Sequence, residues 1–207
     1  MSPVPLVSNL LVPTPIILLA AGSSSRLGQP KQLLPYQGQT LLRRAAETAI
    51  AAAAGAAVVV VTGALHQELL PELEGLPVHI VRNPHWADGM GSSLKTGLAC
   101  LDALPQSLIS VTVMLCDQPF VTSALLEELL VTHARTGRPI VASAYQEASG
   151  VPVFFAREAL PLLRNLPATA GAAQLIRQHA ELVATVSFSK GAIDVDTPEQ
   201  YAALLAE

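Results

Sequence analysis

Cysteine is scarce in this chain of 207 residues, which contains only Cys100 and Cys116, both within apolar stretches. Two such residues provide neither the framework of a disulfide-rich domain nor the ligand set of a structural zinc site. None of the five histidines lies at the i, i+4 spacing of a zinc-binding helix. This cysteine usage is typical of a reducing compartment, so we expect a cytoplasmic protein.

Charged side chains are also few, at 14% of the chain, and aromatic side chains reach only 4%, whereas 51% of the residues are hydrophobic. This composition excludes an intrinsically disordered chain, and the length is sufficient for one domain with a full core. The formal net charge of −4 provides no broad basic surface, so we expect no nucleic-acid partner. A site for a phosphorylated ligand must therefore be local.

Two long stretches have no formally charged side chain. The first, residues 1–25, has no basic start and is interrupted by four prolines, which argues against a signal sequence. We interpret residues 1–14 as a flexible arm and residues 15–207 as a single domain. The second stretch, Thr48–Gln67, changes composition at Gly55 from alanine-rich helix to a buried valine strand. No membrane segment and no membrane partner are expected.

Segments typical of strands and of helices alternate along the chain. Strands are predicted at residues 16–20, 57–62, 78–82, 109–115 and 140–144. Helices are predicted at residues 41–54, 65–73, 93–104, 123–136, 157–166, 172–179 and 198–206. Apolar strands joined by helices predict an α/β fold of three layers, with a mostly parallel sheet and helices on both faces. The loops that follow the first, third and fourth strands should meet at the carboxyl edge of this sheet.

The loop after the first strand has the composition of a phosphate-binding turn. Gly22 and Gly28 permit a tight backbone, and Ser23–Ser25 leave successive amides accessible to phosphate oxygens. Arg26 and Lys31 then supply the positive charge that a triphosphate needs. The loop lacks both the Walker A sequence and the GxGxxG spacing of dinucleotide-binding turns. The alternative is an ordinary turn between a strand and a helix.

Aspartates follow the fourth strand and precede the last helix. Asp117 comes directly after an apolar strand, where one carboxylate suits Mg²⁺, since this ion completes its shell with water and substrate phosphate. Asp194 and Asp196 lie at i and i+2, on one side of an extended segment, so one of them can share the metal with Asp117. Alternatively, Asp117 is a turn residue and Asp196 stabilises the start of the following helix.

The loop after the third strand combines small residues and hydroxyls in front of a predicted helix. Gly89 lets the backbone approach the edge of a flat base, and Ser93 can donate or accept a hydrogen bond there. The alternatives are that Ser92 is only a helix cap and Trp86 only a core residue. We favour the core interpretation for Trp86 and the binding interpretation for Ser93.

Four segments in order carry a resemblance: LAAGSSSRLGQPKQLLP, NPHWADGMGSSLKTGL, MLCDQP and IDVDTPEQY. They resemble the MobA-like nucleotidyltransferases, in particular the molybdenum cofactor cytidylyltransferases. The resemblance implies a Rossmann-like nucleotidyltransferase fold and Mg²⁺-dependent transfer of CMP from CTP to the terminal phosphate of molybdopterin, with release of pyrophosphate. By matching positions, the implied catalytic residues are Arg26, Lys31 and Asp117, and the implied metal ligands are Asp117, Asp194 and Asp196. The implied nucleotide-binding residues are Leu19, Ala20, Ala21, Gly22, Ser23, Ser24, Arg26, Lys31, Gly89 and Ser93.

The choice of CTP rests on Ala20–Gly22, because guanylyl-transferring relatives tend to show Leu-Ala-Gly-Gly at this position. The chain departs from the family pattern at Cys116, at Val151 and at Thr169–Gly171, and the last two departures leave the acceptor open. Alternative functions are transfer from GTP, transfer to another phosphorylated acceptor such as a sugar phosphate, and non-catalytic carriage of the molybdenum cofactor. A molybdoenzyme is a possible transient partner.

Overall fold

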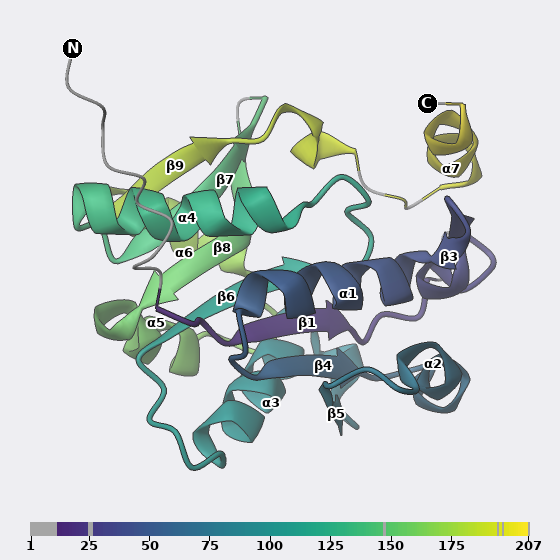
Figure 1. Cartoon of the computed structure of the whole chain (residues 1–207), viewed down its shortest axis with the longest axis horizontal. Helices are drawn as coiled ribbons and strands as arrows, with labels where there is room; N and C mark the ends of the chain where they lie inside the picture. The colour runs from purple at the N-terminus through teal and green to yellow at the C-terminus, as the bar shows by residue number, and fades with distance from the viewer. Residues whose placement is uncertain (1–11, 25–26, 147, 194, 196, 207) are drawn as a thin grey trace.

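The computed structural model describes residues 12–24, 27–146, 148–193, 195 and 197–206. One sheet of seven strands forms its centre, in the order β5-β4-β1-β6-β8-β7-β9 (Figure 1). The strands are β1 (Ile16–Ala20), β4 (Val58–Thr62), β5 (His79–Arg82), β6 (Ser110–Leu115), β7 (Ile140–Tyr145), β8 (Ala148–Ala156) and β9 (Val183–Ser187). A separate two-stranded hairpin consists of β2 (Pro35–Tyr36) and β3 (Gln39–Thr40).

The sheet is mostly parallel, as the alternation of elements predicts. Strand β1 runs parallel to β4 and β6, β4 runs parallel to β5, and β7 runs parallel to β9. Strand β8 is antiparallel to both of its neighbours, β6 and β7. The loops after β1, β5 and β6 therefore leave the sheet at the same edge, where the parallel strands end.

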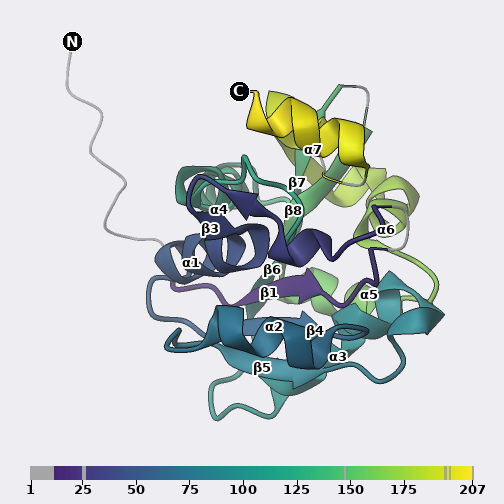
Figure 2. The same cartoon turned by 90° about the vertical axis from the view of Figure 1, so that its right-hand side faces the viewer.

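Helices cover both faces of the sheet and make three layers. The first face is covered by α1 (Leu41–Ala53), α2 (His66–Leu73) and α4 (Ser123–Thr136). The second face is covered by α3 (Met90–Asp102), α5 (Leu160–Arg164) and α6 (Ala172–Gln178). In Figure 2, α1 and α4 lie on one side of the central strands, and α5 and α6 lie on the other. The fold class expected from the sequence is thus confirmed.

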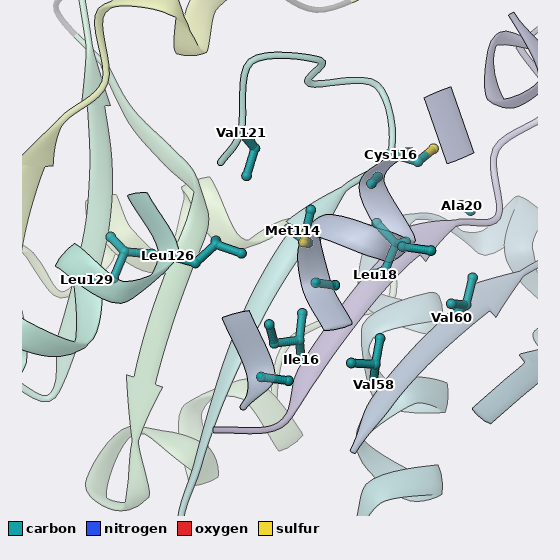
Figure 3. Close-up of a cluster of buried hydrophobic side chains, with 14 of the residues drawn as sticks. Ile16, Leu18, Ala20, Val58, Val60, Met114, Cys116, Val121, Leu126 and Leu129 are labelled. Carbon is teal, nitrogen blue, oxygen red and sulfur yellow. The ribbon is translucent and has the colours of Figure 1, made fainter. Parts of the chain in front are cut away.

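Alternate side chains of β1 enter opposite halves of the core. Ile16, Leu18 and Ala20 face α1 and α4, whereas Ile17 and Leu19 face α3. Figure 3 shows the first of these clusters, with Ile16 and Leu18 beside the side chains of the neighbouring strands. A central strand buried on both faces needs apolar residues at every position, which explains why β1 reads as an unbroken apolar run rather than an alternating one.

A third apolar cluster joins the C-terminal part of the chain to the loop after β1. Val195 and Leu204, the latter on α7 (Pro198–Leu205), pack with Leu27, Leu34 and Tyr36. Figure 1 shows α7 beside β3, at the end of the molecule toward which β1 points. Helix α7 begins with a capping box formed by the side chains of Thr197 and Gln200. The C-terminal segment is thereby held against the functional edge of the sheet.

Several elements of the structure differ from those that the sequence predicts. Strands β8 and β9 and the β2–β3 hairpin were not predicted. For β8 the reason is that Gly150 and Pro152 interrupt its apolar pattern. Helix α3 begins at Met90 and not at Ser93, so Ser93 lies inside the first turn. The predicted flexible arm falls almost entirely on residues outside the described part of the chain. Within the residues that the structure describes, no helix combines the length and the apolar character needed to cross a bilayer.

Candidate functional site

A cavity of about 370 Å³ lies at the carboxyl edge of the sheet, between the loops that follow β1, β5 and β6. These loops are the three that the strand pattern predicts to converge. The described residues expected to bind nucleotide or metal all line this cavity: Leu19, Ala20, Ala21, Gly22, Ser23, Ser24, Lys31, Gly89, Ser93 and Asp117. Arg26, Asp194 and Asp196, which were predicted to join them, lie outside the described residues.

The turn after β1 is held in shape by the side chain of Gln32, which is buried with 1% of its surface exposed. The amide nitrogen of Gln32 donates to the carbonyl oxygens of Gly22, at 2.7 Å, and Ala20, at 3.3 Å. Its amide oxygen accepts from the hydroxyl of Ser24 at 3.0 Å. The hydroxyl oxygen of Ser24 in turn accepts from the backbone N–H of Lys31 at 3.0 Å. One buried amide therefore links the start of the turn, at Ala20 and Gly22, to the residues after it.

Sequence reasoning gave no role to Gln32, although this residue lies in the QPKQ part of the matched motif. The available signal is a polar amide between Lys31 and the apolar pair Leu33–Leu34. Gly63, at the end of β4, was also missed. A Cβ atom on Gly63 would lie 2.4 Å from the carbonyl oxygen of Ala21 and 2.7 Å from Cβ of Trp86. Only glycine lets β4 and the turn approach this closely.

Lys31 and Asp117 form an ion pair that spans the cavity. The Nζ atom of Lys31 lies 2.5 Å from Oδ2 of Asp117, and their side chains are 17% and 9% exposed. The other carboxylate oxygen of Asp117, Oδ1, is buried and has no hydrogen-bond partner. A buried carboxylate oxygen without a donor is costly unless a cation or a donor from a ligand satisfies it. The residues present therefore fit a hard divalent cation, which prefers oxygen ligands.

The loop that carries Asp117 is anchored to the C-terminal segment. The backbone N–H of Val195 donates to the carbonyl oxygen of Asp117 at 3.3 Å. The amide nitrogen of Gln118 donates to the carbonyl oxygens of Val151, at 3.1 Å, and Gly191, at 3.3 Å. Among the described residues, no group of three His, Cys, Asp or Glu side chains is arranged to hold a metal ion. Asp117 is thus the one predicted metal ligand that the described residues place in the cavity.

Cys116 precedes Asp117 and also lines the cavity. Burial, reinforced by the negative charge of Asp117, raises the pKa of its thiol to about 12. Figure 3 shows Cys116 at the end of the apolar cluster, close to Ala20. The thiol stays protonated near neutral pH, so it is not an activated nucleophile.

The third side of the cavity is formed by the loop after β5 and the start of α3. Gly89 has a φ angle of 122°, and a Cβ atom there would lie 2.7 Å from the carbonyl oxygen of Ala168. Ser93 is 4% exposed and lines the cavity. Trp86 is only partly buried and also lines the cavity, so its interpretation as a core residue was wrong. The sequence does not reveal this, because the same indole suits a core or a cavity wall.

Known proteins similar to this chain were found by sequence and by fold. A protein of Paenarthrobacter nicotinovorans named nicotine blue oxidoreductase is 37% identical over 200 residues, which cover 91% of this chain and 95% of that protein. The purine catabolism protein PucB of Bacillus subtilis strain 168 is 27% identical over 197 residues, covering 89% of this chain and 92% of PucB.

Among solved structures, Rv0371c from Mycobacterium tuberculosis H37Rv is similar, with a TM-score of 0.77, 28% identity and coverage of 95% of this chain and 100% of that chain. The structure of Rv0371c is also known as a complex with manganese. The profile of the MobA-like NTP transferase domain matches residues 16–183, a range that includes β1 to β8 and the three loops around the cavity. This chain therefore belongs to the MobA-like NTP transferase family.

Proposed function

We propose that this protein transfers CMP from CTP to the terminal phosphate of a molybdopterin-type acceptor and releases pyrophosphate. The observation that carries the proposal is the cavity in which Lys31 and Asp117 face the turn Ala20–Ser24. This combination of backbone amides, one ammonium and one carboxylate suits a triphosphate and its cation. Family membership supports transfer of a nucleotide. The choices of CTP as the donor and of molybdopterin as the acceptor rest on the resemblance of the sequence to molybdenum cofactor cytidylyltransferases.

The reaction needs no covalent intermediate with the enzyme. A phosphate oxygen of the acceptor attacks the α-phosphorus of CTP in line, the bond from the α-phosphorus to the bridging oxygen breaks, and pyrophosphate leaves with the electron pair. Lys31 offsets the negative charge that builds on the phosphates, and the amides of the turn orient them. The protonated thiol of Cys116 is consistent with direct transfer, because it does not compete as a nucleophile.

Magnesium is the expected ion, and Asp117 would hold it through Oδ1, the buried oxygen without a hydrogen-bond donor. Asp194 or Asp196 would supply a second carboxylate, since Val195, the residue between them, is hydrogen-bonded to the backbone of Asp117. The bound ion would neutralise phosphate charge during transfer. The manganese complex of Rv0371c supports the binding of a divalent cation in this family.

The direct test is to incubate the purified protein with molybdopterin, Mg²⁺ and each of the four common ribonucleoside triphosphates in turn. We expect pyrophosphate only with CTP, together with a product whose mass equals molybdopterin plus a cytidylyl group. Chelation of the metal by EDTA should abolish the product. Release of pyrophosphate with CTP and a sugar phosphate, but not with molybdopterin, would contradict the acceptor assignment and favour a different nucleotidyltransferase.

Two results would point to a different class of protein. Tight binding of the molybdenum cofactor without pyrophosphate release from any triphosphate would favour a carrier. The 37% identity to a protein named nicotine blue oxidoreductase makes oxidation or reduction of nicotine blue a second candidate activity. It is tested by following the absorbance of a reduced nicotinamide cofactor with nicotine blue present, since nicotinamides are common hydride donors. The proposed function would be overturned if the nicotinamide cofactor were oxidised in this assay and no pyrophosphate were released in the assay with the four triphosphates.

A further inference from the structure

Asn83 is a buried polar residue at the end of β5, next to the cavity, and it has no part in the proposed chemistry. Its side chain is 2% exposed, and its backbone N–H donates to the carbonyl oxygen of Thr62 at 2.8 Å. The amide nitrogen of Asn83 donates to two hydroxyls on the first turn of α3, that of Ser92 at 2.8 Å and that of Ser93 at 3.0 Å. Its amide oxygen accepts from the backbone N–H of His85 at 2.9 Å.

The direction of these hydrogen bonds is set by the network. Exchanging the amide oxygen and nitrogen of Asn83 would place an NH₂ group against the N–H of His85, so the orientation is determined. The hydroxyl of Ser92 lies 2.8 Å from two acceptors, the carbonyl oxygens of His85 and Gly89. Its hydrogen is therefore used, and its oxygen accepts from Asn83. Both hydrogens of the Asn83 amide consequently go to serine oxygens.

Ser93 differs from Ser92 in one respect. Its oxygen accepts from Asn83, but no described residue accepts its hydroxyl hydrogen. Ser93 is 4% exposed and lines the cavity, between Gly89 and the ends of the strands. A buried hydroxyl hydrogen without an acceptor carries a desolvation cost that a ligand can relieve. The ligand atom that relieves it must be a hydrogen-bond acceptor.

We propose that Asn83 is a positioning residue that sets the choice of nucleobase by reserving the hydroxyl hydrogen of Ser93 for an acceptor atom. This inference rests on the proposed function and on the expectation from the sequence that the base of the triphosphate lies beside Ser93. Cytosine presents two adjacent acceptors, O2 and N3, on its pairing edge. Uracil carries a hydrogen on N3, and guanine carries hydrogens on N1 and N2. A donor that meets N3 of cytosine discriminates against uracil and guanine, because the hydroxyl hydrogen of Ser93 would face N3–H of uracil or N1–H of guanine instead of an acceptor.

The substitution Asn83→Asp tests the inference with almost no change in shape. A carboxylate keeps the acceptor for the His85 N–H but cannot donate. The hydroxyl of Ser93 therefore turns to donate to the carboxylate and no longer offers its hydrogen to the cavity. We expect the ratio of CTP affinity to UTP affinity, measured by calorimetric titration, to fall about 10-fold. The added negative charge weakens all triphosphates alike and cancels in this ratio. Asn165→Asp, the same change at an exposed site on the end of α5, should leave the ratio unchanged.

Ser93→Ala and the double variant Asn83→Asp/Ser93→Ala complete the experiment. Ser93→Ala removes the hydrogen directly, so it should lower the same ratio even if Asn83→Asp does not fold. The double variant should match Ser93→Ala, because Asn83 acts through Ser93. The inference would be overturned if Asn83→Asp or Ser93→Ala kept the wild-type ratio of CTP affinity to UTP affinity. It would also be overturned if the unmodified protein bound CTP and UTP equally. Neither result would contradict nucleotide transfer. Failure of the unmodified protein to bind any triphosphate would instead contradict the proposed function.

Discussion

The Nζ atom of Lys31 lies 2.5 Å from Oδ2 of Asp117, although the two residues come from different loops, after β1 and after β6. The pair ties the turn to the end of the neighbouring strand, and it leaves Oδ1 of Asp117 without a partner. The two oxygens of the Asp117 carboxylate therefore have different environments. Oδ2 contacts the ammonium group of Lys31, and Oδ1 suits a metal cation. Lys31 and Asp117 compensate each other's charge in a largely buried place, so removing either side chain takes a close counter-charge away from the other.

Asp117→Asn should lower the turnover of nucleotide transfer about 100-fold or more, because a neutral amide binds a divalent cation poorly and no longer pairs with Lys31. Lys31→Ala should have an effect of similar size. Both are measured as pyrophosphate release from the purified variants. Asp102→Asn is the matched control, since Asp102 forms an exposed ion pair with Arg164 away from the cavity. Wild-type turnover in either cavity variant would refute the assigned role.

Gln32→Leu should destabilise the turn after β1. The leucine keeps the approximate volume but leaves the carbonyl oxygens of Ala20 and Gly22 and the hydroxyl of Ser24 without their partner. We expect a loss of about 1–3 kcal/mol in the free energy of unfolding, measured with urea, and an increased KM for the triphosphate. Gln118→Leu is a useful comparison, because it removes a buried amide from the other loop. An unchanged KM in Gln32→Leu would show that the turn does not depend on this amide.

Gly63→Ala should damage both the fold and the site. The added Cβ would meet the carbonyl oxygen of Ala21 at 2.4 Å and Cβ of Trp86 at 2.7 Å, so the backbone of the turn has to move. We expect a cost of about 1–3 kcal/mol and a melting temperature lower by about 2–12 °C. Gly22→Ala is the control, because nothing lies within 4 Å of a Cβ there. Equal melting temperatures for the two variants, measured by differential scanning fluorimetry, would contradict the packing argument.

Cys116 should resist alkylation in the folded protein. Its raised pKa of about 12 means that the neutral thiol is preferred on folding. This preference contributes stability below the ordinary pKa of 9.0, and the contribution is lost as the pH rises from there through about 12. At pH 8, iodoacetamide should therefore modify Cys100, which is partly exposed, well before Cys116.

Mass spectrometry of the labelled protein distinguishes the two thiols. One adduct is expected in buffer and two in concentrated urea, and the Cys100→Ser variant should remain unmodified in buffer. Rapid labelling of Cys116 in that variant, under conditions where the protein is folded, would show that the thiol is reached from the cavity and is ionised.

The central strands and most helices were predictable because they depend on local pattern. The apolar run of β1 and the capping threonines Thr122 and Thr197 specify strands and helix starts through contacts within a few residues. Strand β8 was missed because Gly150 and Pro152 resemble a loop, and its pairing with β6 and β7 involves residues far away in the sequence. Long-range pairing overrides local propensity here, as it does in many sheets.

The candidate site divides in the same way. The sequence by itself determined which chemical groups are present: a turn of small residues with Lys31, and a carboxylate, Asp117, after an apolar strand. Only the tertiary structure decided that these groups share one cavity, that Gln32 and Gly63 shape the turn, and that Asn83 controls the hydrogen of Ser93. The physical reason is that hydrogen bonds and close backbone contacts depend on distances between segments, which strand order and packing establish and which no local pattern encodes.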